Sequence, residues 1–131
     1  VAGVIFTANP EETGIDMYLG IGAAPEGVLA AGALRCVGGQ MQARLILDTA
    51  EKLDRAAKMG VTDPNRKYHL LDLASGDVIV AATGVTNGAL LSGVRFRKDV
   101  IETETVVYRS ATGTVRRIKA EHRELAKFHL D

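Results

Sequence analysis

A short apolar run, a glycine-rich loop and an alanine-rich segment follow one another at residues 15–37, and this order constrains the fold most. Ile15–Ile21 (IDMYLGI) is bounded by turn-forming residues and is predicted to be a buried strand. The loop Gly20–Gly27 (GIGAAPEG) follows it, and Val28–Val37 (VLAAGALRCV) has the composition of a helix. Gly38 comes directly after the last apolar residue, where a helix is expected to stop.

A looser copy of this order occurs at residues 77–94. Asp77–Ala82 (DVIVAA) is β-branched and apolar on both faces, which predicts a central strand, and a second glycine-containing loop follows it. Thr103–Arg109 and Thr114–Ala120 are two further strand-like runs joined by a loop that ends in Gly113, the pattern of a β-hairpin. The chain is therefore predicted to be α/β, with a mixed sheet and a terminal hairpin.

The remaining segments are shorter or less periodic. We expect an amphipathic helix at Thr49–Met59, with Thr49 as its N-cap and an apolar stripe of Leu53, Ala56, Ala57 and Met59. The other expectations are a short helix or turn at Ala2–Ala8, a strand or extended segment at Gln40–Leu47, one helical turn at Leu70–Leu73 and a short helix at His122–His129.

Composition excludes several function classes. The chain has 131 residues, one domain or part of one, and 16 basic residues balance 16 acidic ones, so we expect no nucleic-acid partner. No apolar run is long enough to span a bilayer, and we expect no membrane partner. The single cysteine, Cys36, fits a reducing cytoplasm. Because the chain starts with apolar residues and no Met, we expect a piece of a longer protein.

The loop Gly20–Gly27 is the strongest candidate site. Gly20 and Gly22 permit a tight turn at the end of a strand, and Pro25 suits the first position of a helix. The free N–H groups and the dipole of a helix N-terminus favour an anion such as phosphate. Glu26 adds a carboxylate there, which suggests a divalent cation of the Mg²⁺ type between the two negative groups. The alternative is that Glu26 only caps and complements the helix N-terminus.

The second loop, Thr83–Gly88 (TGVTNG), offers hydroxyls and amides that could hold a phosphate or a sugar hydroxyl. The favoured interpretation is simpler: a strand-to-helix connection in which Asn87-Gly88 supplies a positive φ angle.

The other reactive side chains show no site pattern. The three histidines, His69, His122 and His129, lack metal-ligand spacing, and Cys36 is predicted to be an inert core thiol. Arg116 and Arg117, adjacent on a predicted strand, are expected to point to opposite faces and to serve a solvated surface or a subunit interface.

Taken together, these segments resemble a known family, the class II fructose-1,6-bisphosphatases of the bacterial, glycerol-regulon type and their fructose/sedoheptulose bisphosphatase relatives. The clearest block looks like the family's Y-G-I-G-G-A-P-E-G-V segment. The similar blocks, in order along the chain, are Tyr18–Val28, Gly39–Leu45, Asp72–Ile79, Ala82–Gly88, Leu90–Val94 and Thr112–Ile118.

The resemblance implies a cytoplasmic hydrolase of gluconeogenesis that removes the 1-phosphate of fructose 1,6-bisphosphate, gives fructose 6-phosphate and uses Mg²⁺ or Mn²⁺. It implies the layered α/β sandwich of the lithium-sensitive carbohydrate phosphatases. It assigns Glu26 as a metal ligand and places Ala23, with its neighbours Gly22 and Ala24, in the sugar-phosphate site. The family usually has Gly at the position of Ala23. A backbone N–H contact would survive this change, whereas a positive φ angle would not suit alanine.

The resemblance also implies that residues 1–131 are the C-terminal portion of the enzyme. The family's D-P-I-(D/E)-G-T-type motif does not occur in this chain, and its D-G-D segment would precede Val1. Most metal ligands would then belong to an N-terminal half, which becomes a required partner. We therefore assign no catalytic residue to this chain and expect it to be inactive by itself. We expect the intact enzyme to be a homo-oligomer, a dimer or a tetramer.

Three alternatives remain open at this point. The first is a dual fructose-1,6/sedoheptulose-1,7-bisphosphatase. The second is a non-catalytic module that binds a phosphorylated sugar through the two glycine loops. The third is a structural assembly domain whose terminal hairpin mediates oligomer contacts.

Overall fold

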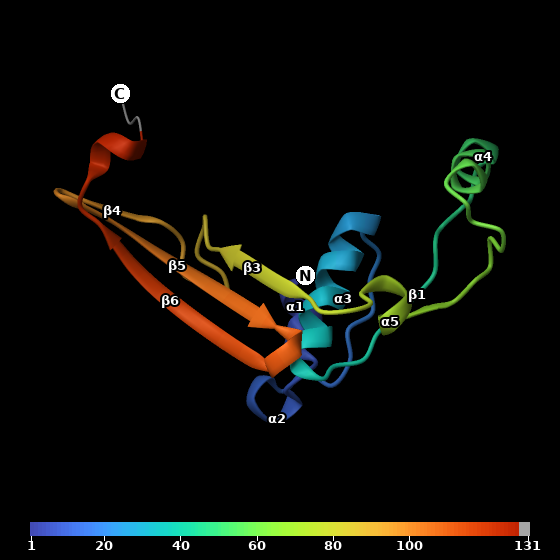
Figure 1. The fold of residues 1–131 in the computed structure, drawn as a ribbon, viewed down its shortest axis with the longest axis horizontal. Helices are drawn as coiled ribbons and strands as arrows, with labels where there is room; N and C mark the ends of the chain where they lie inside the picture. Colours follow the sequence, from blue (N-terminus) through green and yellow to red (C-terminus); the bar gives the residue numbers. More distant parts are fainter. Residues whose placement is uncertain (129–131) are drawn as a thin grey trace.

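The computed structural model describes residues 1–128, which form helices packed on an antiparallel sheet and a small ribbon that leads to an outlying helix (Figure 1). The helices are α1 (Ala2–Phe6), α2 (Pro10–Thr13), α3 (Ala24–Val37), α4 (Ala50–Lys58) and α5 (Leu70–Leu73). The strands are β1 (Gln42–Ala43), β2 (Tyr68–His69), β3 (Ile79–Thr83), β4 (Arg95–Arg97), β5 (Val100–Arg109) and β6 (Thr114–His122). Short 3₁₀ turns occupy Ser110–Thr112 and Leu125–Phe128. None of the helices within residues 1–128 has the length and apolarity needed to cross a membrane.

The larger sheet is built around β5. Strand β6 pairs with β5 along its whole length, from Ile101 opposite His122 to Arg109 opposite Thr114. On the other edge of β5, β4 pairs with its first part and β3 with its second part. The expected hairpin is confirmed, and Gly113 closes it at φ 56°. The α/β class is also confirmed, and every strand pairing among residues 1–128 is antiparallel.

The prediction that DVIVAA forms a central strand is wrong. Strand β3 pairs only with β5 among the described residues, which makes it an edge strand, and the side chain of Ile79 is 67% exposed. A continuous apolar run predicts burial of both faces, but here one face of β3 packs on α3 and the other remains uncovered. The helix expected after this strand is absent from residues 84–94, which form turns leading to β4.

The prediction of a buried strand at Ile15–Ile21 is also wrong. These residues form neither helix nor strand, and Leu19 and Ile21 are each 85% exposed. A strand needs a hydrogen-bonding neighbour, and no strand of residues 1–128 pairs with this segment. The two strand–loop–helix units expected from the sequence are therefore not formed within the described chain.

The main core lies between α3 and one face of the large sheet. Ala33 and Cys36 of α3 pack with Val106 and Tyr108 of β5, and Ile5 and Leu91 close the cluster. Gly32 lets the helix approach β3, because a Cβ atom at this position would lie 3.1 Å from a methyl carbon of Val80. This packing fixes the axis of α3 while its first turn extends beyond the buried part.

Helix α4 forms as predicted but stands apart from the rest of the chain (Figure 1). Thr49 is its N-cap, since the backbone N–H of Lys52 donates to Thr49 Oγ1 at 3.2 Å. Of the expected apolar stripe only Ala56 is buried, whereas Leu53 is 42% and Met59 76% exposed. The helix period was thus readable from sequence, but the surface expected to cover the stripe is not supplied by residues 1–128.

The remaining segments agree with the predictions in part. Helix α1 and the helical turn α5 are formed where expected. Only Gln42–Ala43 of the expected extended segment Gln40–Leu47 is a strand. The tail forms a 3₁₀ turn at Leu125–Phe128 in place of the predicted helix, and His129 lies outside the described residues.

Candidate functional site

The first turn of α3 presents unbonded backbone donors. Ala23 is extended, at φ −73° and ψ 155°, and its carbonyl accepts the first helical hydrogen bond, from the N–H of Gly27 at 3.2 Å. Pro25 is the second helical residue and has no N–H, one position later than the sequence predicted. The N–H groups of Ala24 and Glu26 have no acceptor among residues 1–128. Two free donors and the positive end of a helix of 14 residues therefore meet here, an arrangement that suits an anion.

The Glu26 side chain is exposed at the same turn. Its carboxylate makes no hydrogen bond or ion pair with any part of the chain that the structure describes, and it does not cap the helix. The simpler sequence interpretation, a capping glutamate, thus lacks its hydrogen bond, although the charge still complements the helix dipole. An unbonded carboxylate beside free N–H donors can bind a cation that also contacts an anion.

The neighbours of Glu26 leave this turn open. Ala23 has a negative φ angle, so alanine is not strained at this position. A Cβ atom at Gly22 would meet nothing within 4 Å, whereas one at Gly20 would lie 2.8 Å from the Tyr18 ring. Neither Gly20 nor Gly22 has a positive φ angle. The expected tight turn is therefore absent, and Gly22, Ala23, Ala24 and Glu26 lie on an accessible junction between an extended segment and α3.

The second glycine loop is closed by hydrogen bonds to Glu104 of β5 and by a hydrogen bond of its own Asn87 side chain. Gly84 N–H donates to the Glu104 carbonyl at 3.0 Å, and Ser92 N–H donates to Glu104 Oε2 at 2.7 Å. Asn87 Oδ1 accepts from Gly93 N–H at 2.9 Å, and Gly88 does not have a positive φ angle. The predicted role of Asn87-Gly88 is therefore wrong: the asparagine side chain, not a left-handed glycine, holds the loop.

Strands β5 and β6 complete this closure. The hydrogen bond from Ser92 N–H is the main cause of a lowered pKa at the Glu104 carboxyl. The nearby Lys119 and Arg117 lower this pKa further, whereas desolvation raises it in part. Arg117 Nη1 donates to the Leu90 carbonyl at 2.9 Å. Sequence reasoning missed Glu104 and assigned Arg117 to solvent or to an interface, because a contact over 27 positions of chain leaves no local pattern.

The two glycine loops do not form one site. Figure 1 shows the first turn of α3 and the loop after β3 at separate places in the molecule. Among residues 1–128, no group of three or more His, Cys, Asp or Glu side chains is placed to hold a metal ion. Within this part of the chain Glu26 is therefore not a member of a cluster of three or more possible metal ligands.

The remaining candidates behave as structural residues. Cys36 is buried, burial raises the pKa of its thiol, and Sγ donates to the Gly32 carbonyl at 3.2 Å, so its predicted position in the core is confirmed. His69 caps α5, and His122 Nε2 lies 3.0 Å from Thr103 Oγ1. The Asp72 carboxylate accepts a hydrogen bond from His69 N–H and pairs with Arg66. The hydrogen bond most strongly, and Arg66 as well, lower the pKa of Asp72, whereas desolvation raises it in part.

Comparison with known proteins gives a consistent result. The family described as bacterial fructose-1,6-bisphosphatase, glpX-encoded, matches residues 1–122. A protein of Synechococcus elongatus named D-fructose 1,6-bisphosphatase class 2/sedoheptulose 1,7-bisphosphatase is 41% identical over 123 residues, covering 84% of this chain and 36% of the relative. A protein of the same name from Synechococcus sp. strain JA-3-3Ab is 44% identical over 123 residues, covering 84% of this chain and 35% of the relative. The chain thus spans about a third of the length of these curated relatives.

Proposed function

Because the chain belongs to the family of bacterial, glpX-encoded fructose-1,6-bisphosphatases, we propose that it is the C-terminal portion of an enzyme that hydrolyses the 1-phosphate of fructose 1,6-bisphosphate. The first turn of α3 carries this proposal, since its exposed Glu26 carboxylate lies beside two N–H groups that have no acceptor within residues 1–128. The family match supports the reaction class. We propose that the product is fructose 6-phosphate, that the enzyme serves gluconeogenesis and that it is cytoplasmic.

We propose that Glu26 holds Mg²⁺ or Mn²⁺. Its exposed carboxylate fits such a role, because Mg²⁺ is commonly bound by one or two carboxylates together with water and substrate phosphate. A bound divalent ion supplies Lewis-acid polarisation of the phosphoryl group and a lower pKa for bound water. The remaining ligands would come from the N-terminal half of the enzyme.

The backbone of the same turn binds and orients the phosphate in this proposal. The N–H groups of Ala24 and Glu26 donate to phosphate oxygens, and the helix dipole offsets their negative charge. Ala23 and Gly22 keep the approach open, since neither position presents a side chain larger than a methyl group. The chain thus forms one wall of the substrate site and is inactive without the N-terminal half.

Exposed apolar surface supports the need for that partner. Leu19 and Ile21 are each 85% exposed, on an extended segment that leads directly into the proposed site. We propose that the N-terminal half packs against this segment. We further propose a homo-oligomer, a dimer or a tetramer, with contacts on the sheet face that exposes Ile79, Phe96 and Ile118.

A second candidate is a dual fructose-1,6/sedoheptulose-1,7-bisphosphatase. The two Synechococcus relatives, which are named for both activities, favour it. Of the two non-catalytic alternatives, a module that binds sugar phosphate through both glycine loops is less supported, because the loop after β3 is closed by Glu104 and lies apart from α3. Phosphate release from each bisphosphate by the full-length enzyme separates the three.

The metal role of Glu26 is tested by Glu26→Gln in the full-length enzyme. We expect phosphate release from fructose 1,6-bisphosphate to fall by roughly 100-fold, with a higher Mn²⁺ concentration needed for half-maximal activity. The matched control is Glu51→Gln, because Glu51 occupies the first turn of α4 as Glu26 does that of α3. Near-normal turnover of Glu26→Gln at limiting Mn²⁺ would contradict the proposed ligand role.

A further inference from the structure

The β1–β2 ribbon brings two cationic side chains to one surface. Gln42 pairs with His69 and Ala43 with Tyr68, so the same register places Arg44 opposite Lys67 just beyond the last pair. Opposite residues of an antiparallel ribbon share a face and lie close together. Gln42, Ala43, Arg44 and Lys67 line an open recess of about 240 Å³. Two cations and one amide therefore border an open surface recess that has room for a small anion.

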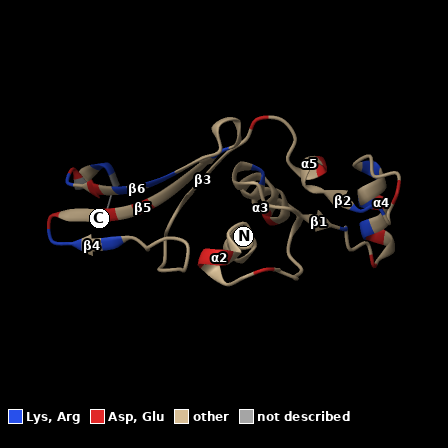
Figure 2. Ribbon diagram, turned by 90° about the horizontal axis from the view of Figure 1, so that it is seen from below, with Lys and Arg blue, Asp and Glu red and all other residues tan. Residues whose placement is uncertain are grey.

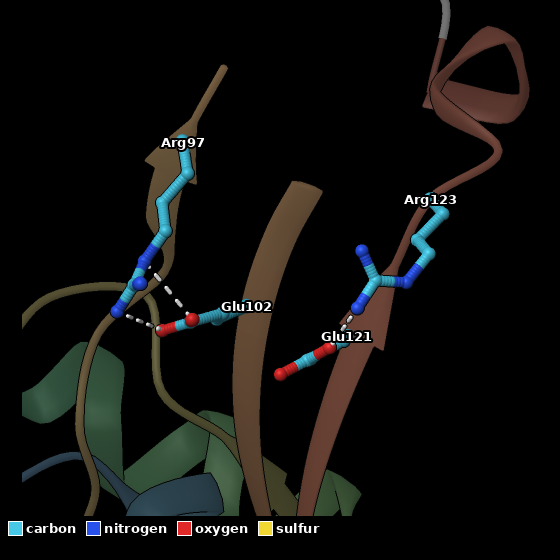
Figure 3. Close-up of polar contacts among 4 residues, drawn as sticks. All are labelled: Arg97, Glu102, Glu121 and Arg123. Atoms are coloured by element: carbon cyan, nitrogen blue, oxygen red, sulfur yellow. Dashed lines mark hydrogen bonds and ion pairs between the residues drawn. The ribbon is translucent and has the colours of Figure 1, made fainter. Parts of the chain in front are cut away.

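Arg44 and Lys67 lack the ion pairs that neutralise two opposed like charges on the large sheet. Like charges directly opposite each other destabilise a ribbon, and neither Arg44 nor Lys67 has an acidic partner within residues 1–128. On the large sheet, Glu102 also lies opposite a residue of its own charge, Glu121. There each carboxylate has an arginine, Arg97 for Glu102 and Arg123 for Glu121 (Figure 3).

The neighbourhood of the recess shows the same contrast. The basic residue that precedes Lys67, Arg66, lies just before β2, is paired with Asp72 and has its Cζ 4.8 Å from the centre of the Tyr68 ring. Lys52, in α4, is paired with Asp48. Figure 2 shows that basic and acidic segments alternate around α4 and the ribbon. Arg44 and Lys67 thus lie opposite each other without an acidic partner in the part of the chain that the structure describes.

We propose that this recess is an anion site for a phosphate group, either inorganic phosphate or the phosphate of a small metabolite. The Arg44 guanidinium offers a planar fork of donors, Lys67 a compact positive charge and Gln42 an amide N–H, a set that suits a doubly charged tetrahedral anion. None of the four residues that line the recess belongs to the first turn of α3. It lies at the base of residues 45–66, which carry α4, so a bound anion would draw together the two ends of that segment.

The test measures phosphate bound per protomer by equilibrium dialysis of the full-length protein against radiolabelled inorganic phosphate, without divalent metal and at constant ionic strength. The double variant Arg44→Gln/Lys67→Gln should lose one phosphate per protomer, or bind it at least about tenfold more weakly, because two charge-assisted contacts are removed. The matched control is Lys98→Gln/Arg109→Gln, which removes the same charges from exposed positions elsewhere and should bind phosphate as the wild type does.

Equal phosphate binding by the wild type and the Arg44/Lys67 double variant would overturn the proposal. So would complete displacement by chloride at the same ionic strength, or a wild-type recess that binds no phosphate because a carboxylate from the rest of the protein occupies it. Arg44→Lys, which keeps the charge but not the fork, should give intermediate affinity and guards against a folding artefact. Hydrolysis of fructose 1,6-bisphosphate by the double variant should be unchanged, so this proposal and that for Glu26 can fail separately.

Discussion

The two glycine-rich loops of this chain have similar compositions but opposite states of hydrogen bonding. At the start of α3, the Ala24 and Glu26 N–H groups and the Glu26 carboxylate have no partner within residues 1–128. In the loop after β3, Glu104 accepts from two backbone N–H groups, and Arg117 donates to the loop from β6. The difference teaches that glycine content does not identify a binding loop. What matters is whether the donors are already used, and the contacts that use them come from distant strands.

The largest expected effect on stability comes from adding a methyl group to the closed loop after β3, whereas the same change in the open loop before α3 should have almost none. In Gly84→Ala the new Cβ would overlap the carbonyl oxygen of Ser92, so we expect a loss of about 3 kcal/mol in unfolding free energy. Gly22→Ala places its Cβ in open space and should change stability by no more than about 0.5 kcal/mol. Chemical denaturation of both variants of the full-length protein measures this difference. Similar losses in the two variants would show that the loops do not differ in packing as described.

The sequence predicted the features of the fold that depend on local contacts and failed for those that depend on distant ones. Helix α4 with its Thr49 cap, the end of α3 before Gly38 and the β5–β6 hairpin were all predicted, because period, capping and turn residues are local signals. The strand at Ile15–Ile21 and the central position of β3 were mispredicted. Both depend on which segments pair with them, and an apolar run does not specify its neighbour.

The candidate site residues were likewise predictable from sequence only where their signal is local. The helix N-terminus and its carboxylate were visible in the order Gly-Ala-Ala-Pro-Glu, so Glu26 could be selected from sequence alone. The opposition of Arg44 and Lys67 could not, because it depends on the register between β1 and β2. The network of Glu104 was equally hidden, since its partners Ser92 and Gly84 precede it by one strand and a turn. Residue type therefore suggests local sites, while pairing reveals those assembled across strands.

A smaller effect should appear when the closed loop is titrated. The pKa of Glu104 is lowered in the folded state, chiefly by the Ser92 N–H, so this carboxylate stabilises the fold above its ordinary pKa of 4.5. That contribution is lost as the pH falls below this value and Glu104 becomes protonated. Glu104→Gln should therefore lower the thermal midpoint near pH 7, and its difference from wild type should shrink on acidification below pH 4.5.

The measurement for Glu104 is the thermal midpoint of each full-length protein over a pH series. Glu12→Gln is the control, because Glu12 is exposed on α2 and its side chain makes no hydrogen bond or ion pair with the part of the chain that the structure describes. A difference between wild type and Glu104→Gln that stays constant across pH would show that the carboxylate does not hold the loop through its charge.

The smallest effect on stability is expected at Ala23, where the family resemblance predicts glycine. Ala23 is the N-cap of α3 at φ −73°, which alanine adopts without strain, so glycine is not required by the backbone. Ala23→Gly gains a better N-cap residue but adds freedom to the unfolded chain, and these opposing terms should leave stability within roughly 0.5 kcal/mol of wild type. If the role of this residue is a backbone contact to phosphate, the KM for fructose 1,6-bisphosphate should also stay within about twofold. Steady-state kinetics and denaturation of the full-length enzyme test both values. A large fall in KM would mean that the alanine methyl group obstructs the phosphate, and the first turn of α3 would then be less open than its geometry indicates.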